Sequence, residues 1–152
     1  MKRSKGLLLV LLAVFAILLL AACGSTAVTP DPNAPKPSNS GGTGKALTLT
    51  GDPVAGKEIF DRTCATCHGS EGTGGVENSG AAEEVPELKP ADEFYNADPA
   101  VFAANLDLFI EHGSKPEGDN PTLSMPAFGD DGTLTAQQIA DVIAYVISLN
   151  KK

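Results

Sequence analysis

The clearest hydrophobic pattern lies near the C-terminus, where apolar residues recur at the spacing of one helix face. The stripe consists of Ile139, Val142, Ile143 and Val146, and it is completed by Tyr145 and Leu149. Thr135 and Gln138 precede it at the spacing of a capping box, which marks the start of a helix. The pattern predicts an amphipathic helix over residues 135–149.

Two further helices are predicted from the residues at their ends. The first begins with Asp52 as a cap and Pro53 at the first helical position, and it runs to about residue 64. The other begins at Asp98 and ends at His112, where Gly113 supplies a stop. Its expected buried side chains are Phe102, Leu106, Phe109 and Ile110. Residues 69–97 between these helices are rich in glycine and acids and read as loop, with one short helical turn at most.

Gly56 suggests how the two ends of this region meet. Gly56, Phe60 and Cys64 are spaced i, i+4 and i+8, so they share one face of the first helix. A glycine inside a helix costs about 1 kcal/mol relative to alanine, which indicates that another element packs closely against it. We expect the C-terminal helix to cross there, over Gly56 and Phe60.

The N-terminal stretch predicts export from the cytoplasm. A basic start at residues 1–5 is followed by an uncharged apolar run at residues 7–22, the pattern of a signal peptide. The run closes with Ala21, Ala22 and Cys23, which resemble the lipobox of bacterial lipoproteins, so residues 1–22 are expected to be cleaved and Cys23 to be lipidated. An uncleaved signal anchor is the alternative, because the length of the run falls only slightly below that of a typical membrane-spanning helix.

Composition divides the rest of the chain into a linker and one domain. Residues 23–50 contain the lipidated cysteine and a stretch rich in proline, glycine and serine, which predicts a linker with an r.m.s. span of ~30 Å. It is either a swinging tether or a passive stalk. Residues 51–152 have the common size of a single domain.

Charge limits the classes of partner. The chain has 11 basic and 19 acidic residues, and removal of residues 1–22 takes away three basic ones, which leaves a net charge of −11. Nucleic acid and anionic membrane surfaces are therefore poor partners. A basic docking surface on another protein would be attracted, although excess charge also serves solubility alone.

The candidate chemistry is concentrated in five residues, Cys64-Ala65-Thr66-Cys67-His68. Two cysteines separated by two residues and followed by histidine form the attachment sequence of a c-type haem. A structural zinc site needs four ligands, and outside the motif only Cys23 and His112 remain. A thioredoxin-like pair needs a βαβ context, which the helical pattern does not offer. We therefore expect Cys64 and Cys67 to bind haem covalently and His68 to reach the iron.

Met125 is the candidate for the second axial position of the iron. The chain has two methionines, and Met1 would be lost with the signal peptide. Met125 lies in a loop, before the helix-breaking Pro126, and His/Met is the ligand pair that raises the potential of cytochromes c. His112 is the other conceivable ligand, although its place at a helix end favours a capping role.

With these residues in view, residues 51–152 resemble a class I c-type cytochrome, the small bacterial monohaem kind. The resemblance is carried by Gly56, Phe60, the CxxCH motif, the Met125-Pro126-Ala127-Phe128 loop and Tyr145. It implies an all-α cytochrome c fold of three to five helices around one covalent haem c. It also implies thioethers at Cys64 and Cys67, axial ligands His68 and Met125, and a loop proline, matched here by Pro86, whose carbonyl accepts the other imidazole proton. Tyr95 is considered for the propionate contact that a tryptophan makes in some relatives, because this chain has no tryptophan.

The function that follows is one-electron transfer by a membrane-tethered monohaem cytochrome outside the cytoplasm, in a respiratory or photosynthetic chain. The protein would be either a mobile carrier or a subunit of a quinol-oxidising or oxidase complex, with redox proteins as partners and no substrate at the iron. A haem enzyme or gas sensor with an open sixth iron position is the alternative. A structural lipoprotein with an incidental CxxCH would be colourless.

Overall fold

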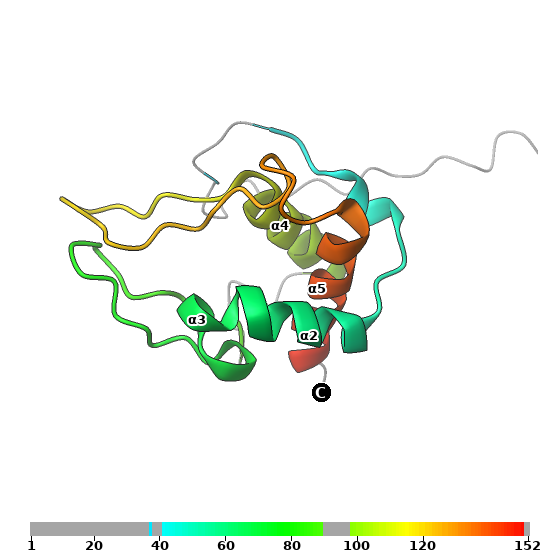
Figure 1. Ribbon diagram of the computed structural model, residues 1–152, viewed down its shortest axis with the longest axis horizontal. Coiled ribbons are helices and arrows are strands. Elements are labelled where there is room, and N and C mark those ends of the chain that lie inside the picture. Colours follow the sequence, from blue (N-terminus) through cyan, green and yellow to red (C-terminus); the bar gives the residue numbers. More distant parts are fainter. Residues whose placement is uncertain (1–36, 38–40, 90–97, 151–152) are drawn as a thin grey trace, which may run out of the picture.

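The structure, a computed structural model, describes residues 37, 41–89 and 98–150. Helices and irregular loops make up the fold (Figure 1). In chain order, the elements are η2 (Lys45–Thr48), α2 (Pro53–Thr63), α3 (Ala65–His68), η3 (Ser70–Gly72), α4 (Pro99–His112) and α5 (Ala136–Leu149). No strand forms within this part of the chain, where Ser114 and Met125 make an isolated antiparallel bridge. The expectation of an all-α fold with three to five helices is confirmed.

The start and end of α2 agree with the sequence prediction. The Asp52 carboxylate accepts a hydrogen bond from the Val54 amide at 2.8 Å, and Pro53 occupies the first turn. Because proline has no amide hydrogen, it suits the position where a helical donor would lack a partner. The helix ends at Thr63, so Cys64 lies at its C-terminal cap.

The crossing of α2 and α5 forms the centre of the fold, as expected (Figure 1). A Cβ on Gly56 would clash with the Asp141 carbonyl of α5 and come within 2.9 Å of Tyr145 Cβ. One turn later, the rings of Phe60 and Tyr145 meet edge to face with centroids 5.3 Å apart. Phe60 is fully buried, and the predicted stripe of α5 is also buried: Ile139, Val142, Ile143 and Val146. The absence of a side chain at residue 56 is what lets the helices approach this closely.

Helix α4 packs against α5 and carries its predicted end signals. The Asp98 carboxylate accepts a hydrogen bond from the Ala100 amide at 2.8 Å, and Gly113 follows the helix with φ +67°. Three of the four side chains expected on its inner face are buried, namely Phe102, Leu106 and Ile110, whereas Phe109 is only half-buried.

Residues 41–50, which we call the strap, differ from the expectation of a linker. Ala46 is 2 % exposed and belongs to the hydrophobic core, and η2 contacts both α4 and α5. At its end, the Thr50 carbonyl accepts a hydrogen bond from Gln137 Nε2 at 2.9 Å. The folded domain therefore begins before residue 51.

Several expectations concern residues outside the described part. The signal peptide at 1–22, Cys23, most of the linker up to residue 40, and Tyr95 all fall there. Among the residues that are described, none of the helices has the length and apolar character needed to cross a membrane.

Candidate haem site

The junction between α2 and α3 presents the CxxCH residues together. The Cys64 amide closes the last turn of α2 on the Phe60 carbonyl at 2.8 Å, and the amides of Cys67 and His68 then bond to the Cys64 carbonyl at 3.1 and 2.9 Å. This short helical turn places both thiols and the imidazole on one small segment. Both cysteines are free thiols and half-buried, and Cys64 packs against the core. Burial, with a smaller contribution from Cys67, raises the pKa of the Cys64 thiol to about 11.

The imidazole of His68 is oriented by a carbonyl from a distant loop. His68 Nδ1 lies 3.2 Å from the Pro86 oxygen. Because a carbonyl only accepts, Nδ1 carries the hydrogen, and Nε2 keeps the lone pair that a metal needs. Burial lowers the pKa of His68, and the bond to Pro86 opposes this effect in part. The neutral ring is therefore favoured, which is the form that binds a metal.

Met125 lies in a second loop, which is fixed to the end of α4. Its amide donates to the Ser114 carbonyl at 2.8 Å, and its carbonyl accepts from the Ser114 amide at 3.0 Å. The side chain is half-buried and packs against the hydrophobic core. These two hydrogen bonds hold a residue that no helix or strand supports.

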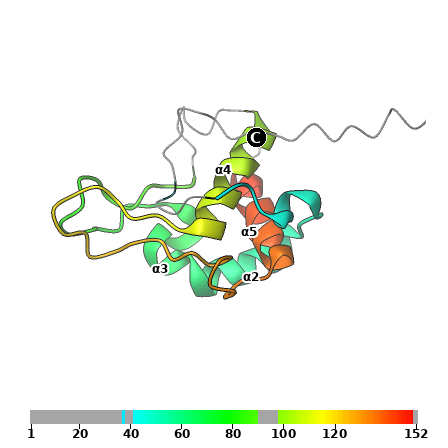
Figure 2. The ribbon, with the colours of Figure 1, turned by 90° about the horizontal axis from the view of Figure 1, so that it is seen from above.

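Asn78 joins the two loops, and its role was not evident from the sequence. It is 8 % exposed; its side-chain oxygen accepts from the Leu123 amide at 2.8 Å and its side-chain nitrogen donates to the Leu123 carbonyl at 3.1 Å. The Thr122 hydroxyl adds a third bond to Asn78 Oδ1 at 3.3 Å. Asn78 thus links the loop that contains Pro86 to the loop that contains Met125. Figures 1 and 2 show the two loops reaching out on the same side, with their tips together. An asparagine between glycines and acids is typical of any turn, so no local pattern indicates this contact.

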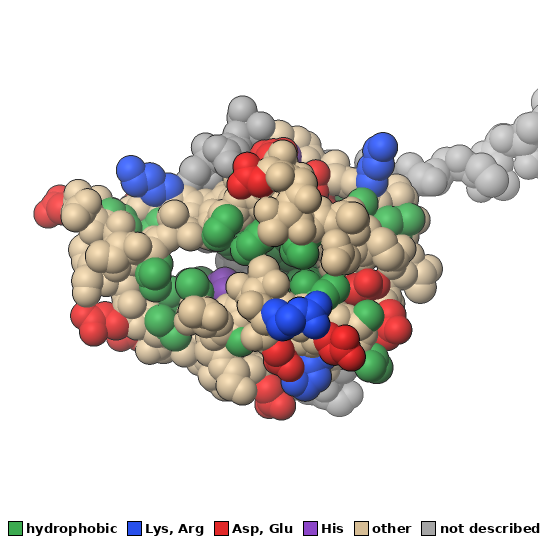
Figure 3. All heavy atoms as spheres, in the orientation of Figure 1, with side chains coloured by type: hydrophobic (Ala, Val, Ile, Leu, Met, Phe, Trp, Pro, Cys, Tyr) green, Lys and Arg blue, Asp and Glu red, His purple; other side chains and the backbone are tan. Residues whose placement is uncertain are grey.

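The donor set fits a covalently held haem. Two thiols and an imidazole come from the α2–α3 junction, and a thioether comes from the loop of residues 114–125, which is the set expected for a His/Met c-type haem. The space-filling view shows an opening between these parts, bordered by hydrophobic side chains and with a histidine at its edge (Figure 3). An apolar opening of this kind suits a porphyrin. Across the described ranges, no cluster of three or more His, Cys, Asp or Glu side chains could hold a metal ion by itself.

His112 is engaged elsewhere. Its Nδ1 bonds to Asp130 Oδ2 and its Nε2 to the Gly42 carbonyl, each at 2.9 Å. Both partners are acceptors, so both ring nitrogens carry hydrogens and neither offers a lone pair to iron. The bond to Asp130, followed by that to Gly42, raises the pKa of His112, in agreement with a charged ring.

Comparison with known proteins agrees with this geometry. The family model for cytochrome c matches residues 53–150. The chain is 38 % identical over 103 residues to the Cbb3-type cytochrome c oxidase subunit CcoP of Azospirillum sp. (strain B510), which covers 65 % of this chain and 31 % of that protein. It is 31 % identical over 97 residues to the subunit FixP of Sinorhizobium medicae, covering 64 % and 30 % of the two chains. Cytochrome c6 of Rippkaea orientalis is 33 % identical over 100 residues, covering 66 % and 73 %. No solved structure gives a significant match.

The family match covers most of the helical domain, whereas the longer relatives are matched over only part of their length. The chain spans about a third of the length of the CcoP and FixP relatives. The family match covers almost all of that domain, from the first residue of α2 to the residue that follows α5. The chain therefore belongs to the cytochrome c family, with covalently bound haem c at a CxxCH motif.

Proposed function

We propose that this protein transfers single electrons with His68 and Met125 as the two axial ligands of its haem iron, and with no substrate bound at the metal. The hydrogen bond between His68 Nδ1 and the Pro86 carbonyl carries the proposal, because it leaves Nε2 as the ligating nitrogen. Such a contact fixes the ring plane and raises the basicity of the ligand. Met125 is the thioether that remains after loss of Met1, and its loop is linked to that of Pro86 through Asn78.

In this proposal, the chain holds both ligands in place in either oxidation state. When bound, the haem supplies the one-electron couple. Cys64 and Cys67 fix the cofactor to the α2–α3 junction through thioether bonds. Pro86 orients His68, and the paired loops keep Met125 from being replaced by water. Because the ligand set stays the same during the redox change, little rearrangement opposes electron transfer.

The ligand assignment is tested by Met125→Ala in the mature, haem-loaded protein. Covalent attachment needs only Cys64 and Cys67, so the variant should remain red after denaturation. Its reduction potential should fall, and its ferrous form should bind carbon monoxide, since the sixth position is then open. An unchanged potential together with unchanged carbon monoxide binding would rule out Met125 as a ligand.

A further part of the proposal is a lipid tether on the outer side of the membrane. Residues 1–22 have the pattern of a lipoprotein signal peptide, and Cys23 would become the lipidated N-terminus. A linker then leads to the strap. The Cys23→Ser variant should lose the mass of the lipid and leave the membrane fraction. Retention of that variant in the membrane would instead indicate an uncleaved anchor.

The proposed partners are redox proteins with basic docking surfaces. The mature chain would have a net charge of −11, which attracts basic surfaces and speeds encounter. Relatives named as subunits of a Cbb3-type cytochrome c oxidase suggest an oxidase complex as one setting, and cytochrome c6 suggests a mobile carrier as the other. Copurification from membranes at low and high salt distinguishes a fixed subunit from a carrier.

The geometry gives no support to a haem enzyme or gas sensor. That alternative needs an acid or base beside an open sixth position. His112 is the histidine outside the CxxCH motif, and its two nitrogens are bonded to Asp130 and Gly42.

A further inference from the structure

His112 connects two segments that are distant in the sequence. It is the last residue of α4, and its side chain is 9 % exposed. One ring nitrogen donates to Asp130, in the segment that follows the Met125 loop, and the other donates to Gly42 at the start of the strap. A cation at the C-terminal end of a helix is also favoured by the helix dipole.

The same end of α4 holds Met125. Gly113 follows His112, and a Cβ there would lie 2.8 Å from the Ala127 nitrogen, so only glycine lets the chain pass this close. Its φ of +67° also disfavours other residues. Ser114 comes next and makes both hydrogen bonds to Met125. His112 is thus two residues away from the contact that positions the proposed ligand.

The segment after Met125 wraps around the end of α4. The Gly129 amide donates to the Ile110 carbonyl at 3.3 Å, and the Asp130 amide donates to the Glu111 carbonyl at 3.0 Å. These bonds satisfy carbonyls that the helix leaves without partners at its last turn. The side-chain bond between Asp130 and His112 adds a charged pair to this cap.

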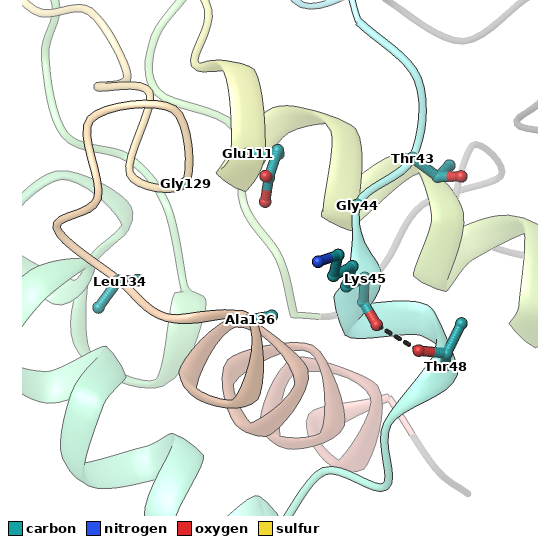
Figure 4. Close-up of a pocket in the computed structure, with 8 residues that line it drawn as sticks. All are labelled: Thr43, Gly44, Lys45, Thr48, Glu111, Gly129, Leu134 and Ala136. Atoms are coloured by element: carbon teal, nitrogen blue, oxygen red, sulfur yellow. Dashed lines mark hydrogen bonds between the residues drawn. The ribbon is translucent and has the colours of Figure 1, made fainter.

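The strap closes the arrangement from the other side. The Gly44 amide donates to the Asp107 carboxylate of α4, and Asp107 is fully buried. Between the strap, α4 and the start of α5 lies a pocket whose lining includes Lys45, Glu111 and Gly129, drawn as sticks in Figure 4. The bond from His112 to Gly42 and the bond from Gly44 to Asp107 thus hold the start of the strap against α4.

We propose that His112 is a positioning residue for Met125, because it ties both the strap and the segment containing Asp130 to the end of α4, from which the Met125 loop starts. The inference rests on the proposed ligation of iron by Met125. His112 would influence the iron ligand through the backbone that leads to the Met125 loop, without touching the haem itself.

The arrangement depends on the charge of His112. The charged groups near the ring are Asp130 from the loop, and Asp107 and Glu111 from α4, while the strap contributes the Gly42 carbonyl. All three side chains are acidic, so they favour the protonated ring. When the pH rises enough to remove a proton, one of the two hydrogen bonds from the ring is lost, and Met125 should be released more readily.

Carbon monoxide binding to the ferrous, fully matured protein tests the inference, because carbon monoxide must displace Met125. Its apparent affinity scales with the fraction of molecules in which Met125 is released. In His112→Gln and Asp130→Asn, this affinity should rise about tenfold below pH 6.5, the effect of losing one hydrogen bond to a charged group. Glu58→Gln is the control for Asp130→Asn, because it also removes one negative charge, at an exposed site of α2. It should change the carbon monoxide affinity less than about twofold.

The pH profile separates this role from general destabilisation. The wild-type affinity should rise as the pH passes through the pKa of His112, and the His112→Gln profile should lack this step. Exchange of the Gly44 and Asp130 amides should be faster in His112→Gln. Suppose that the wild type shows a methionine charge-transfer band but the variants bind carbon monoxide no better than it does. That result would overturn the role of His112 and leave ligation by Met125 standing. A wild type without that band would overturn the ligation, and with it the inference.

Discussion

The close approach of α2 and α5 at Gly56 leads to a prediction in which two effects have opposite signs. Replacement of a helical glycine by alanine improves helix propensity by about 1 kcal/mol. At Gly56, however, the added methyl group would clash with the Asp141 carbonyl and lie 2.9 Å from Tyr145 Cβ. The Asp141 carbonyl belongs to the backbone of α5, so it cannot rotate away as a flexible side chain would.

The steric effect should exceed the gain in propensity. Overpacking a closely packed contact costs about 1–3 kcal/mol, and contact with backbone belongs at the upper end of that range. We expect Gly56→Ala to lower the free energy of unfolding by about 1–2 kcal/mol after the gain in propensity is subtracted. For a domain of this size, this corresponds to a fall in Tm of roughly 4–16 °C.

Urea unfolding of the haem-loaded protein, followed by far-UV circular dichroism, measures this change as a shift of the midpoint at constant m. Ala55→Gly, at the neighbouring and half-buried position of α2, is the matched control for propensity. It should cost about 0.5–1 kcal/mol without any clash. If Gly56→Ala were more stable than the wild type, the close crossing of α2 and α5 would be refuted.

Three further predictions concern the core, the loops and pH. Phe60→Ala should lower the free energy of unfolding by about 3–5 kcal/mol in urea titrations, because Phe60 is fully buried and loses its ring contact with Tyr145; a loss below 1 kcal/mol would contradict the packing. Asn78→Ala removes the side chain that bonds to the Leu123 amide and carbonyl. Hydrogen exchange of the Leu123 amide should therefore be faster in the variant, while the amides of α5 keep their protection. Equal exchange of the Leu123 amide in both proteins would contradict the link between the loops. The pKa of His112 is raised on folding, so its stabilisation is fully present below pH 6.5 and is lost as the pH rises through the higher folded value. Unfolding free energies of wild type and His112→Gln should therefore converge at alkaline pH, and a constant difference across the range would contradict that sign.

The helices could be predicted from the sequence because their signals are local. Asp52 and Asp98 act as caps within two residues of their partners, and the stripe from Ile139 to Val146 lies on one helix. The glycine at residue 56 identified the crossing, since a helix tolerates glycine where another element needs the space.

Other parts of the site depend on contacts that no local pattern reveals. The partners of His112 lie 70 and 18 residues away, and Asn78 meets Leu123 across 45 residues. The strap was expected to be linker because it follows a stretch rich in proline, glycine and serine with few apolar residues. Ala46, Leu47 and Leu49 are too few to show a helix or strand period, although Ala46 lies in the core and Leu47 packs against it.

Closure of the iron site by His68 and Met125 can be measured in the visible spectrum of the mature protein. The protein would be matured with haem c and measured in both oxidation states, with and without carbon monoxide. A closed site should give a sharp ferrous c-type spectrum, a methionine-to-iron charge-transfer band in the ferric form, and little response near neutral pH to carbon monoxide at concentrations that saturate Met125→Ala. A high-spin spectrum, or one that changes fully at the same carbon monoxide concentrations, would show an open iron site and contradict ligation by Met125.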